Sequence, residues 1–298
     1  KRVTNSDGAT LACFEGFKVY GNSHGQLVGY PSSRHSLSCV SIATDKDDMQ
    51  RDYAYSVNRR FDALDSPEYI GKKAAREVVS RLHAEKIATA KVPVLFRADI
   101  ANTVFGHFIA AISGGNLYRK SSFLLDALGQ QIFPDFLTIE ERPHIHQALA
   151  SSAFDSEGVA TIDRNIVTQG TLDSFLLTSY SARKLGMETT GHAGGIHNWL
   201  VSANGGDFND MLKRLGTGLL VTELMGQGVN VVNGDYSRGA AGFWVENGEI
   251  AFPVSEITIA GKLQDMFKGI VAVGNDTDMH GSIRTGSILI DEIQVAGV

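Results

Sequence analysis

Apolar and polar residues alternate through much of the first sixty positions. Apolar residues between 14 and 20 precede a turn-like Gly-Asn-Ser run at 21–23, and the two-residue period returns over 35–43 and 48–57. Alternation of this kind between turn signals predicts strands with one buried face. We therefore expect strands over most of residues 11–56.

A helical period follows this segment. Ser66 is a good N-cap, Pro67 suits the first helical position, and apolar residues then recur at helical spacing up to Leu82. Residues 85–91 have the pattern of a connector, and 92–96 that of a buried strand. Beyond them, Asp99 predicts a helix that runs through Ile112 and stops at the Gly pair 114–115, with a second helical stretch over 117–128.

Hairpin signals dominate the second half of the chain. Asn-Gly at 247–248 separates apolar runs, and this pair tolerates the two positive φ angles of a two-residue hairpin turn. Further turns are expected at 233–234 and at 169–170, the latter between strands at 166–168 and 172–178. Short helices are expected at 207–215 and 262–267, and one or two strands within 286–298. Because strands outnumber helices, we predict an α+β fold that is strand-rich, with largely antiparallel sheets and a few helices.

The composition narrows the class of protein. The 298 residues include 32 Gly and carry a formal net charge of −6. No dense basic stripe of the kind that binds a phosphate backbone is present, so we expect no nucleic-acid partner. Two cysteines, Cys13 and Cys39, cannot make a disulfide framework, and their apolar surroundings predict buried thiols in a reducing compartment.

Membrane spans and targeting peptides leave recognisable signals in a sequence. No apolar run reaches 18 residues, so we expect no membrane span. The chain starts with Lys1 in the middle of a strand-like pattern and shows no signal peptide. We expect that an N-terminal part of the protein is absent from this sequence.

Histidines are the main resource for metal chemistry. His107 lies on the predicted helix from Asp99, but no second His or neighbouring Glu precedes it by one turn, so this helix alone does not predict a metalloprotease site. His144-x-His146 offers two ligands where a zinc site needs three or four, and loop histidines are the more common explanation. An independent hydrolase that uses this pair with a distant third ligand is retained as an alternative.

A glycine-rich segment at 191–199 carries two more histidines. His192 and His197 flank Gly194, and glycines there would allow the backbone to approach a ligand closely. A substrate-contact loop and a plain turn with bystander histidines are equally consistent with this pattern. Glu223 lies within an apolar run, where it is either a buried carboxylate that needs a partner or a solvent-facing strand residue.

Several segments together resemble the TldD/PmbA (TldE) family, most closely its PmbA/TldE branch. The resemblance spans the whole chain and rests on TSYSARKLG at 178–186, GHAGG at 191–195, TELMGQG at 222–228, GDYSRGAAGFWVENG at 234–248 and VAVGND at 271–276. It implies that residues 1–88 are the remainder of a central α+β domain ending in a helix, and that 89–298 are the C-terminal β-rich domain.

The resemblance also implies a function. Family members form a cytoplasmic, bacterial metalloprotease assembly that acts on extended peptides, in which a TldD-type subunit carries a His-Glu-x-x-x-His helix and a zinc-binding Cys. Here the corresponding positions hold Asn102, Thr103 and His107, and the segment matching the Cys, residues 274–278, contains none. We therefore expect no catalytic residue, metal ligand or cofactor in this chain, and zinc in the partner.

We therefore expect this chain to be a subunit that completes the peptide-binding chamber of a TldD-type partner. The residues expected to line that chamber are Asn102, Thr103, His107, His192, Gly194, His197 and Glu223. We expect a heterodimer, a homodimer when the chain is alone, and a cytoplasmic location. The alternative function is a non-proteolytic regulator of another protein, such as DNA gyrase, a role with which the family has also been associated.

Overall fold

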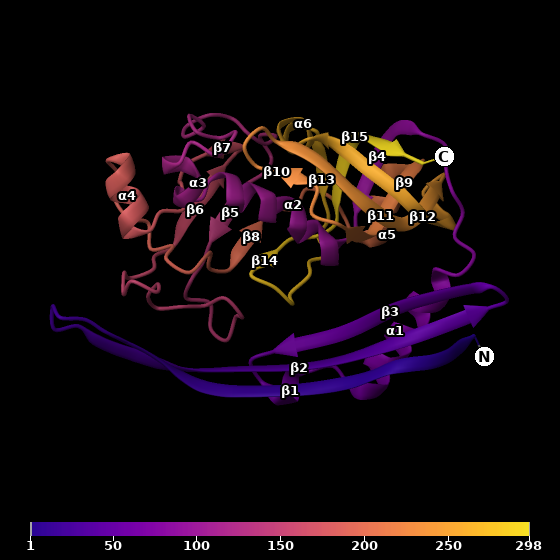
Figure 1. Cartoon of the computed structure of the whole chain (residues 1–298), viewed down its shortest axis with the longest axis horizontal. Helices are drawn as coiled ribbons and strands as arrows, with labels where there is room; N and C mark the ends of the chain where they lie inside the picture. Colours follow the sequence, from indigo (N-terminus) through magenta and orange to yellow (C-terminus); the bar gives the residue numbers. More distant parts are fainter. Residues whose placement is uncertain (1, 298) are drawn as a thin grey trace. The chain divides into compact units, whose positions relative to one another are not determined.

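The computed structural model describes residues 2–297, and the chain divides into two units (Figure 1). The first unit runs to Ala84 and also includes His146–Leu149, whereas the second holds Glu85–Ile145 and the residues from Ala150 onward. Both units are strand-rich, most strand pairs are antiparallel, and helices are few. The α+β prediction is confirmed.

The first unit is a three-stranded antiparallel sheet with one long helix. The strands lie in the order β1-β2-β3, and their bounds are β1 Val3–Gly21, β2 Leu27–Asp45 and β3 Asp48–Asn58. A 3-10 turn, η1 Phe61–Ala63, leads to α1 Pro67–Ser80, whose N-cap Ser66 accepts the Tyr69 N–H as its sequence predicts. Ile70 and Ala74 of α1 pack against Ala54 of β3.

Strand β1 has little cover. Helix α1 packs mainly on β2 and β3, so Phe14, Phe17 and Leu27 of the β1–β2 hairpin are exposed. For the same reason Cys13 on β1 is exposed, while Cys39 on β2 is half-buried. The prediction that both thiols are buried is therefore wrong.

The second unit contains two sheets. The larger has seven strands, in the order β10-β11-β12-β15-β4-β9, with β13 on β15. Strand β11 also pairs with β9, so five strands form a closed circuit in which only β4 and β9 are parallel. The bounds are β4 Ala90–Phe96, β9 Gly218–Met225, β10 Val229–Asn230, β11 Asp235–Glu246, β12 Glu249–Lys262, β13 Ile270–Val273 and β15 Ile288–Ala296.

The smaller sheet has five short strands in the order β14-β8-β5-β6-β7. Their bounds are β5 Ile139–Glu141, β6 Arg164–Thr168, β7 Thr171–Leu172, β8 Trp199–Val201 and β14 Ile283–Arg284. Helix α2 lies between the two sheets (Figure 1) and shares one continuous core with both, through residues such as Phe108. The helices of this unit are α2 Ala98–Ala111, α3 Gly114–Tyr118, α4 Ser179–Leu185, α5 Phe208–Leu215 and α6 Leu263–Lys268.

Turn and cap signals in the sequence identify most of these elements. Asn247 and Gly248 have φ angles of 53° and 79° and join β11 to β12, and Gly234 is likewise positive in φ. Helix α5 begins at its N-cap Asp207 with a capping box, and α6 and β15 lie where helix and strand were expected.

Two expected elements are missing or much shorter than predicted. The helix predicted over 117–128 is absent, because α3 ends at Tyr118 and Ser122 instead donates from its hydroxyl to the Ala111 carbonyl and folds the chain into a turn. The strand predicted over 172–178 contributes only Leu172 to β7. Among residues 2–297, no helix is both long and apolar enough to cross a bilayer.

Candidate functional site

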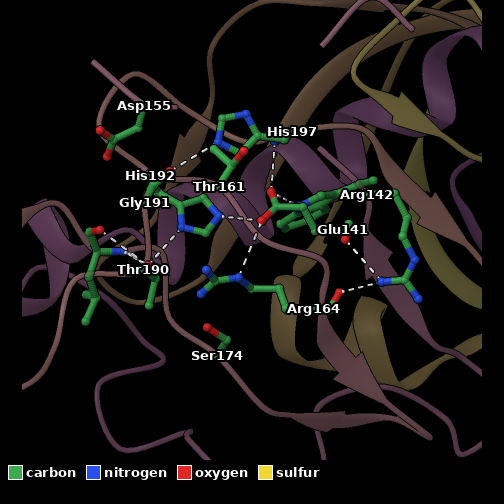
Figure 2. A network of polar contacts seen from close by, with 12 residues as sticks. Glu141, Arg142, Asp155, Thr161, Arg164, Ser174, Thr190, Gly191, His192 and His197 are labelled. Atoms are coloured by element: carbon green, nitrogen blue, oxygen red, sulfur yellow. Dashed lines mark hydrogen bonds and ion pairs between the residues drawn. The ribbon is translucent and has the colours of Figure 1, made fainter. Parts of the chain in front are cut away.

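A fully buried carboxylate organises the smaller sheet. Glu141, at the end of β5, is 1% exposed and accepts three hydrogen bonds (Figure 2). Its Oε1 accepts the His197 backbone N–H at 2.8 Å and the Trp199 indole N–H at 3.1 Å. Its Oε2 lies 2.8 Å from His192 Nε2 and 3.8 Å from Arg164 Nε. We refer to these residues, with Thr190, as the Glu141 network.

The hydrogen bonds set the charge of this carboxylate. Burial alone would raise the pKa of Glu141, but the bonds from His192 and from the His197 amide outweigh burial and leave the pKa below its ordinary value. Glu141 is therefore ionised at neutral pH and can only accept. It follows that His192 Nε2 carries a proton and donates to Glu141.

The same network holds the histidine-rich loop. His192 Nδ1 lies 2.8 Å from Thr190 Oγ1, and His197 Nε2 donates to the Gly191 carbonyl at 3.1 Å. Gly194 has φ +107°, and a Cβ there would stand 2.6 Å from the Ser156 hydroxyl oxygen, so this position needs glycine. Both histidine side chains belong to the interior, since His192 is 6% and His197 7% exposed.

Helix α2 carries the next group of predicted residues. The Thr103 hydroxyl donates to the Ile100 carbonyl at 2.7 Å within the helix, and the Asn102 amide nitrogen lies 3.9 Å from where a Cβ on Gly281 would stand. The His107 ring packs edge-on against the Tyr236 ring, with centroids 5.7 Å apart. Its Nε2 is buried without a hydrogen-bond partner among the described residues.

Electrostatics around His107 disfavour a cation. Burial, and then the nearby Arg238 guanidinium, hold the pKa of His107 below its ordinary value, so the ring is neutral. Burial raises the pKa of Tyr236 to about 12, so this phenol also stays neutral. Neither group supplies a negative charge for a metal ion.

The segment at 274–278 meets the start of α2. Asp276 accepts both the backbone N–H and the hydroxyl of Ser287, at 2.8 and 2.6 Å. The Ser287 hydroxyl oxygen in turn accepts the Ala98 N–H of the first turn of α2, at 3.1 Å. The two regions that the family resemblance singles out are therefore neighbours, joined through one buried serine.

Glu223 lies apart from these residues. It pairs with Ala241 between β9 and β11, while the next pair, Leu224 and Ala240, packs on the core that contains α2. Glu223 is half-buried, and the register between β9 and β11 shifts directly after this pair.

The structure thus brings some candidates near one another and separates others. Asn102, Thr103 and His107 share α2, and His192, Gly194 and His197 share the loop before β8. Phe108 of α2 contacts Trp199, with ring centroids 5.9 Å apart, and Trp199 donates to Glu141. Sequence reasoning missed Glu141, which connects the loop with the helix.

The remaining histidine pair is on the surface. His144 and His146 are exposed, and His144 Nε2 forms a 3.0 Å hydrogen bond with the Thr161 hydroxyl. Within residues 2–297, no group of three or more His, Cys, Asp or Glu side chains is arranged to hold a metal ion. The structure offers no third ligand to this pair among the residues it describes.

Comparison with known proteins places this arrangement in a family. Residues 1–82 match the PmbA/TldA metallopeptidase central domain, and residues 89–297 match the PmbA/TldA metallopeptidase C-terminal domain. Metalloprotease PmbA of Escherichia coli O157:H7 is 58% identical over 297 residues, and its Haemophilus influenzae homolog is 57% identical over 298. The chain is matched over its whole length but spans only 66% of the length of these two relatives.

Solved structures agree. A Thermotoga maritima protein described as a candidate modulator of DNA gyrase is 33% identical, with a TM-score of 0.91 over 99% of this chain and 70% of its own. A Bacteroides thetaiotaomicron protein of the same description is 28% identical, with a TM-score of 0.95 over 100% of this chain and 68% of its own. TldE from Thermococcus kodakarensis, 22% identical, shares the fold with a TM-score of 0.85 over 97% of this chain and 69% of its own. The chain belongs to the PmbA/TldA metallopeptidase family.

Proposed function

We propose that this chain is the PmbA-type subunit of a peptidase assembly, and that it shapes the peptide chamber while a TldD-type partner carries the zinc. The observation that carries this proposal is the state of helix α2. Where the family resemblance expects a His-Glu-x-x-x-His helix, this chain has Asn102, Thr103 and His107, and the one remaining imidazole packs on a neutral tyrosine.

The residues present do not fit a zinc ion at this helix. A protein zinc site needs three or four ligands drawn from imidazole, thiolate and carboxylate. Asn102 and Thr103 carry none of these ligand groups, and the Thr103 hydroxyl already donates a hydrogen bond to the Ile100 carbonyl. Burial, and then the nearby positive charge of Arg238, lower the pKa of His107. The positive charge of Arg238 would repel a divalent cation at this position.

The role left to this chain is to bind and orient an extended peptide. Strand edges and loops can hold such a peptide through its main chain with little regard to its sequence. Hydrogen bonds of Glu141 attach the 191–199 loop to β5, and those of Ser287 with Asp276 and Ala98 attach the 274–287 segment to α2. Ordered walls of this kind support a positioning role, because preorganised groups lose less entropy when a ligand binds.

The decisive experiment compares the full-length protein alone and mixed with its TldD-type partner. We expect no stoichiometric zinc and no cleavage of an unfolded peptide by this protein alone, and cleavage that a chelator abolishes once both are mixed. His107→Ala in this chain should leave the amount of zinc bound by the mixture unchanged, because the residue supplies no ligand. Stoichiometric zinc together with cleavage by the single protein would refute the proposal.

A regulatory role is the second candidate. It is favoured by one observation, namely that similar solved structures are described as candidate modulators of DNA gyrase. If this chain acts in that way, immobilised full-length protein should retain purified gyrase in the absence of any TldD-type partner. Retention of the TldD-type subunit without gyrase would instead favour the role as a peptidase subunit. In that role we also expect this protein to form homodimers when alone and to reside in the cytoplasm.

A further inference from the structure

The guanidinium of Arg164 is only partly used by the protein. The side chain is 17% exposed, and its Nε is buried without a hydrogen-bond partner. Nε forms an ion pair with Glu141 Oε2 at 3.8 Å, which is too long for a hydrogen bond. Only Nε is fully enclosed, and the two terminal nitrogens remain accessible to solvent.

The neighbouring arginine shows the ordinary arrangement. Arg142, one residue after Glu141, directs Nη1 to the backbone carbonyls of Glu141 and Arg164 and pairs its Nη2 with Glu140 at 2.8 Å. Two arginines on paired strands therefore differ sharply. The Arg164 guanidinium is thus held beside Glu141 while its terminal N–H groups stay open to a group from outside the protein.

Glu141 does not accept a hydrogen bond from the Arg164 guanidinium. Its two oxygens already accept from the His197 amide, the Trp199 indole and His192. The carboxylate therefore holds the guanidinium in place by charge from the Nε side, without using its fork. In the view of Figure 2 the terminal nitrogens point away from Glu141, toward the side on which Thr190 and Ser174 are drawn.

We propose that the Nη edge of Arg164 is a binding site for a carboxylate. The planar fork of two parallel N–H donors matches a carboxylate bidentately, and such charge-assisted pairs are about twice as strong as neutral hydrogen bonds. Because Glu141 already balances the Arg164 charge, recognition depends on the fork geometry rather than on net attraction. The fork is also preorganised, since Arg164 lies on strand β6 beside a fully buried counter-ion.

Within the proposed function, the carboxylate belongs to a peptide, as a free C-terminus or as an Asp or Glu side chain. Arg164 then binds the C-terminus or one acidic side chain of the substrate and so places that part of the peptide beside the 191–199 loop. This identification of the ligand rests on the proposed peptide chamber, whereas carboxylate recognition by Arg164 does not.

The test is a titration of the full-length protein with three capped dipeptides, followed by NMR of the arginine side-chain N–H groups. Acetyl-Ala-Leu with a free C-terminus and acetyl-Glu-Ala-amide each carry one carboxylate, and acetyl-Ala-Leu-amide carries none. We expect one or both of the first two to shift the Arg164 signals and the third to leave them unchanged. Which of the two binds distinguishes a C-terminal from a side-chain carboxylate.

Variants isolate the fork from the charge. Arg164→Gln should weaken binding about tenfold or more, as expected for a lost hydrogen bond to a charged group, and Arg164→Lys, which keeps the charge but not the fork, should weaken it nearly as much. Arg183→Gln removes one positive charge from an exposed position on α4 and should change binding little. Unfolding curves for all three variants identify any that fail to fold, and Arg164→Lys is the variant that best preserves the network.

Equal binding of all three dipeptides, or an absence of any shift at Arg164, would overturn the proposal. So would full binding by a folded Arg164→Lys variant. Because these titrations need no TldD-type partner, failure to assemble a peptidase would leave them unaffected, and failure of the titrations would leave the assembly test unaffected.

Discussion

Replacing Glu141 by Gln tests whether a buried carboxylate really organises the second unit. The amide oxygen of Gln can still accept from the His197 N–H and the Trp199 indole, but its NH₂ group then faces His192 Nε2. One charge-assisted hydrogen bond is lost, which costs about 1.5–3 kcal/mol. Arg164 also loses its counter-ion, so we expect a destabilisation of about 3 kcal/mol or more.

The consequence can be measured by thermal unfolding. In a domain of this size, about 3 kcal/mol corresponds to a fall in Tm of roughly 6–12 °C. Both tryptophans of the chain, Trp199 and Trp244, lie in the second unit, so their fluorescence follows that unit specifically. The indole N–H signal of Trp199 reports the network directly, because this group donates to Glu141.

The adjacent residue provides a matched control. Glu140→Gln is the same chemical change one position away, but Glu140 forms a partly exposed ion pair with Arg142. Such pairs contribute about 0–1 kcal/mol. If Glu140→Gln and Glu141→Gln unfolded at the same temperature and left the Trp199 indole signal alike, the reasoning from the Glu141 network would be refuted.

Further predictions concern pH, one helix residue and two glycines. Hydrogen bonds outweigh burial and keep the pKa of Glu141 low, so the stabilisation by its ionised form is present above about pH 4.5 and is lost as the pH falls further. The difference in Tm between wild type and Glu141→Gln should therefore narrow in acid. A difference that stays constant with pH would contradict this. His107→Phe keeps a ring beside its neighbour and removes a buried unpartnered nitrogen, so urea unfolding should show a free energy unchanged or up to about 1 kcal/mol higher, not lower. Gly242→Ala would place a Cβ 1.9 Å from the Leu220 carbonyl oxygen and should lower Tm strongly or prevent folding. Gly106→Ala, an exposed helical site with open space, should instead stabilise by about 0.5–1 kcal/mol in the same assay.

Signals contained in a few adjacent residues were readable from the sequence. Ser66 before Pro67 identified the start of α1, and Asn-Gly at 247–248 identified the β11–β12 turn, because caps and tight turns depend on local backbone geometry. The Gly pair at 114–115 misled for the opposite reason. A Cβ on Gly114 would stand 2.2 Å from the Ser181 hydroxyl oxygen, so this glycine permits α3 to approach α4 rather than ending a helix. A contact between residues 67 positions apart, such as Gly114 with Ser181, cannot be recognised from the pattern of neighbouring residues.

The candidate site shows the same division. His192 and His197 attracted notice because glycines surround them, and the sequence left open whether they contact substrate or are bystanders. The structure adds a third role, in which both rings are interior supports of a loop. Whether Asn102, Thr103, His107 and the other predicted residues line a peptide chamber stays a prediction, because a chamber depends on a partner chain.

Glu141 is the residue whose omission is most instructive, because the sequence does hold a signal for it. It stands beside Glu140 and Arg142, and three consecutive charged residues are typical of a solvated surface. Yet Leu137, Ile139 and Glu141 are spaced by two, and the first two are fully buried, so the strand period places the Glu141 carboxylate on the inward face. A carboxylate at an inward position needs hydrogen-bond donors, because burying its charge without them would destabilise the fold by several kcal/mol. The period of the apolar residues predicted where Glu141 points; only the fold, which brings residues 51 to 58 positions later beside it, supplies the donors that make that position tolerable.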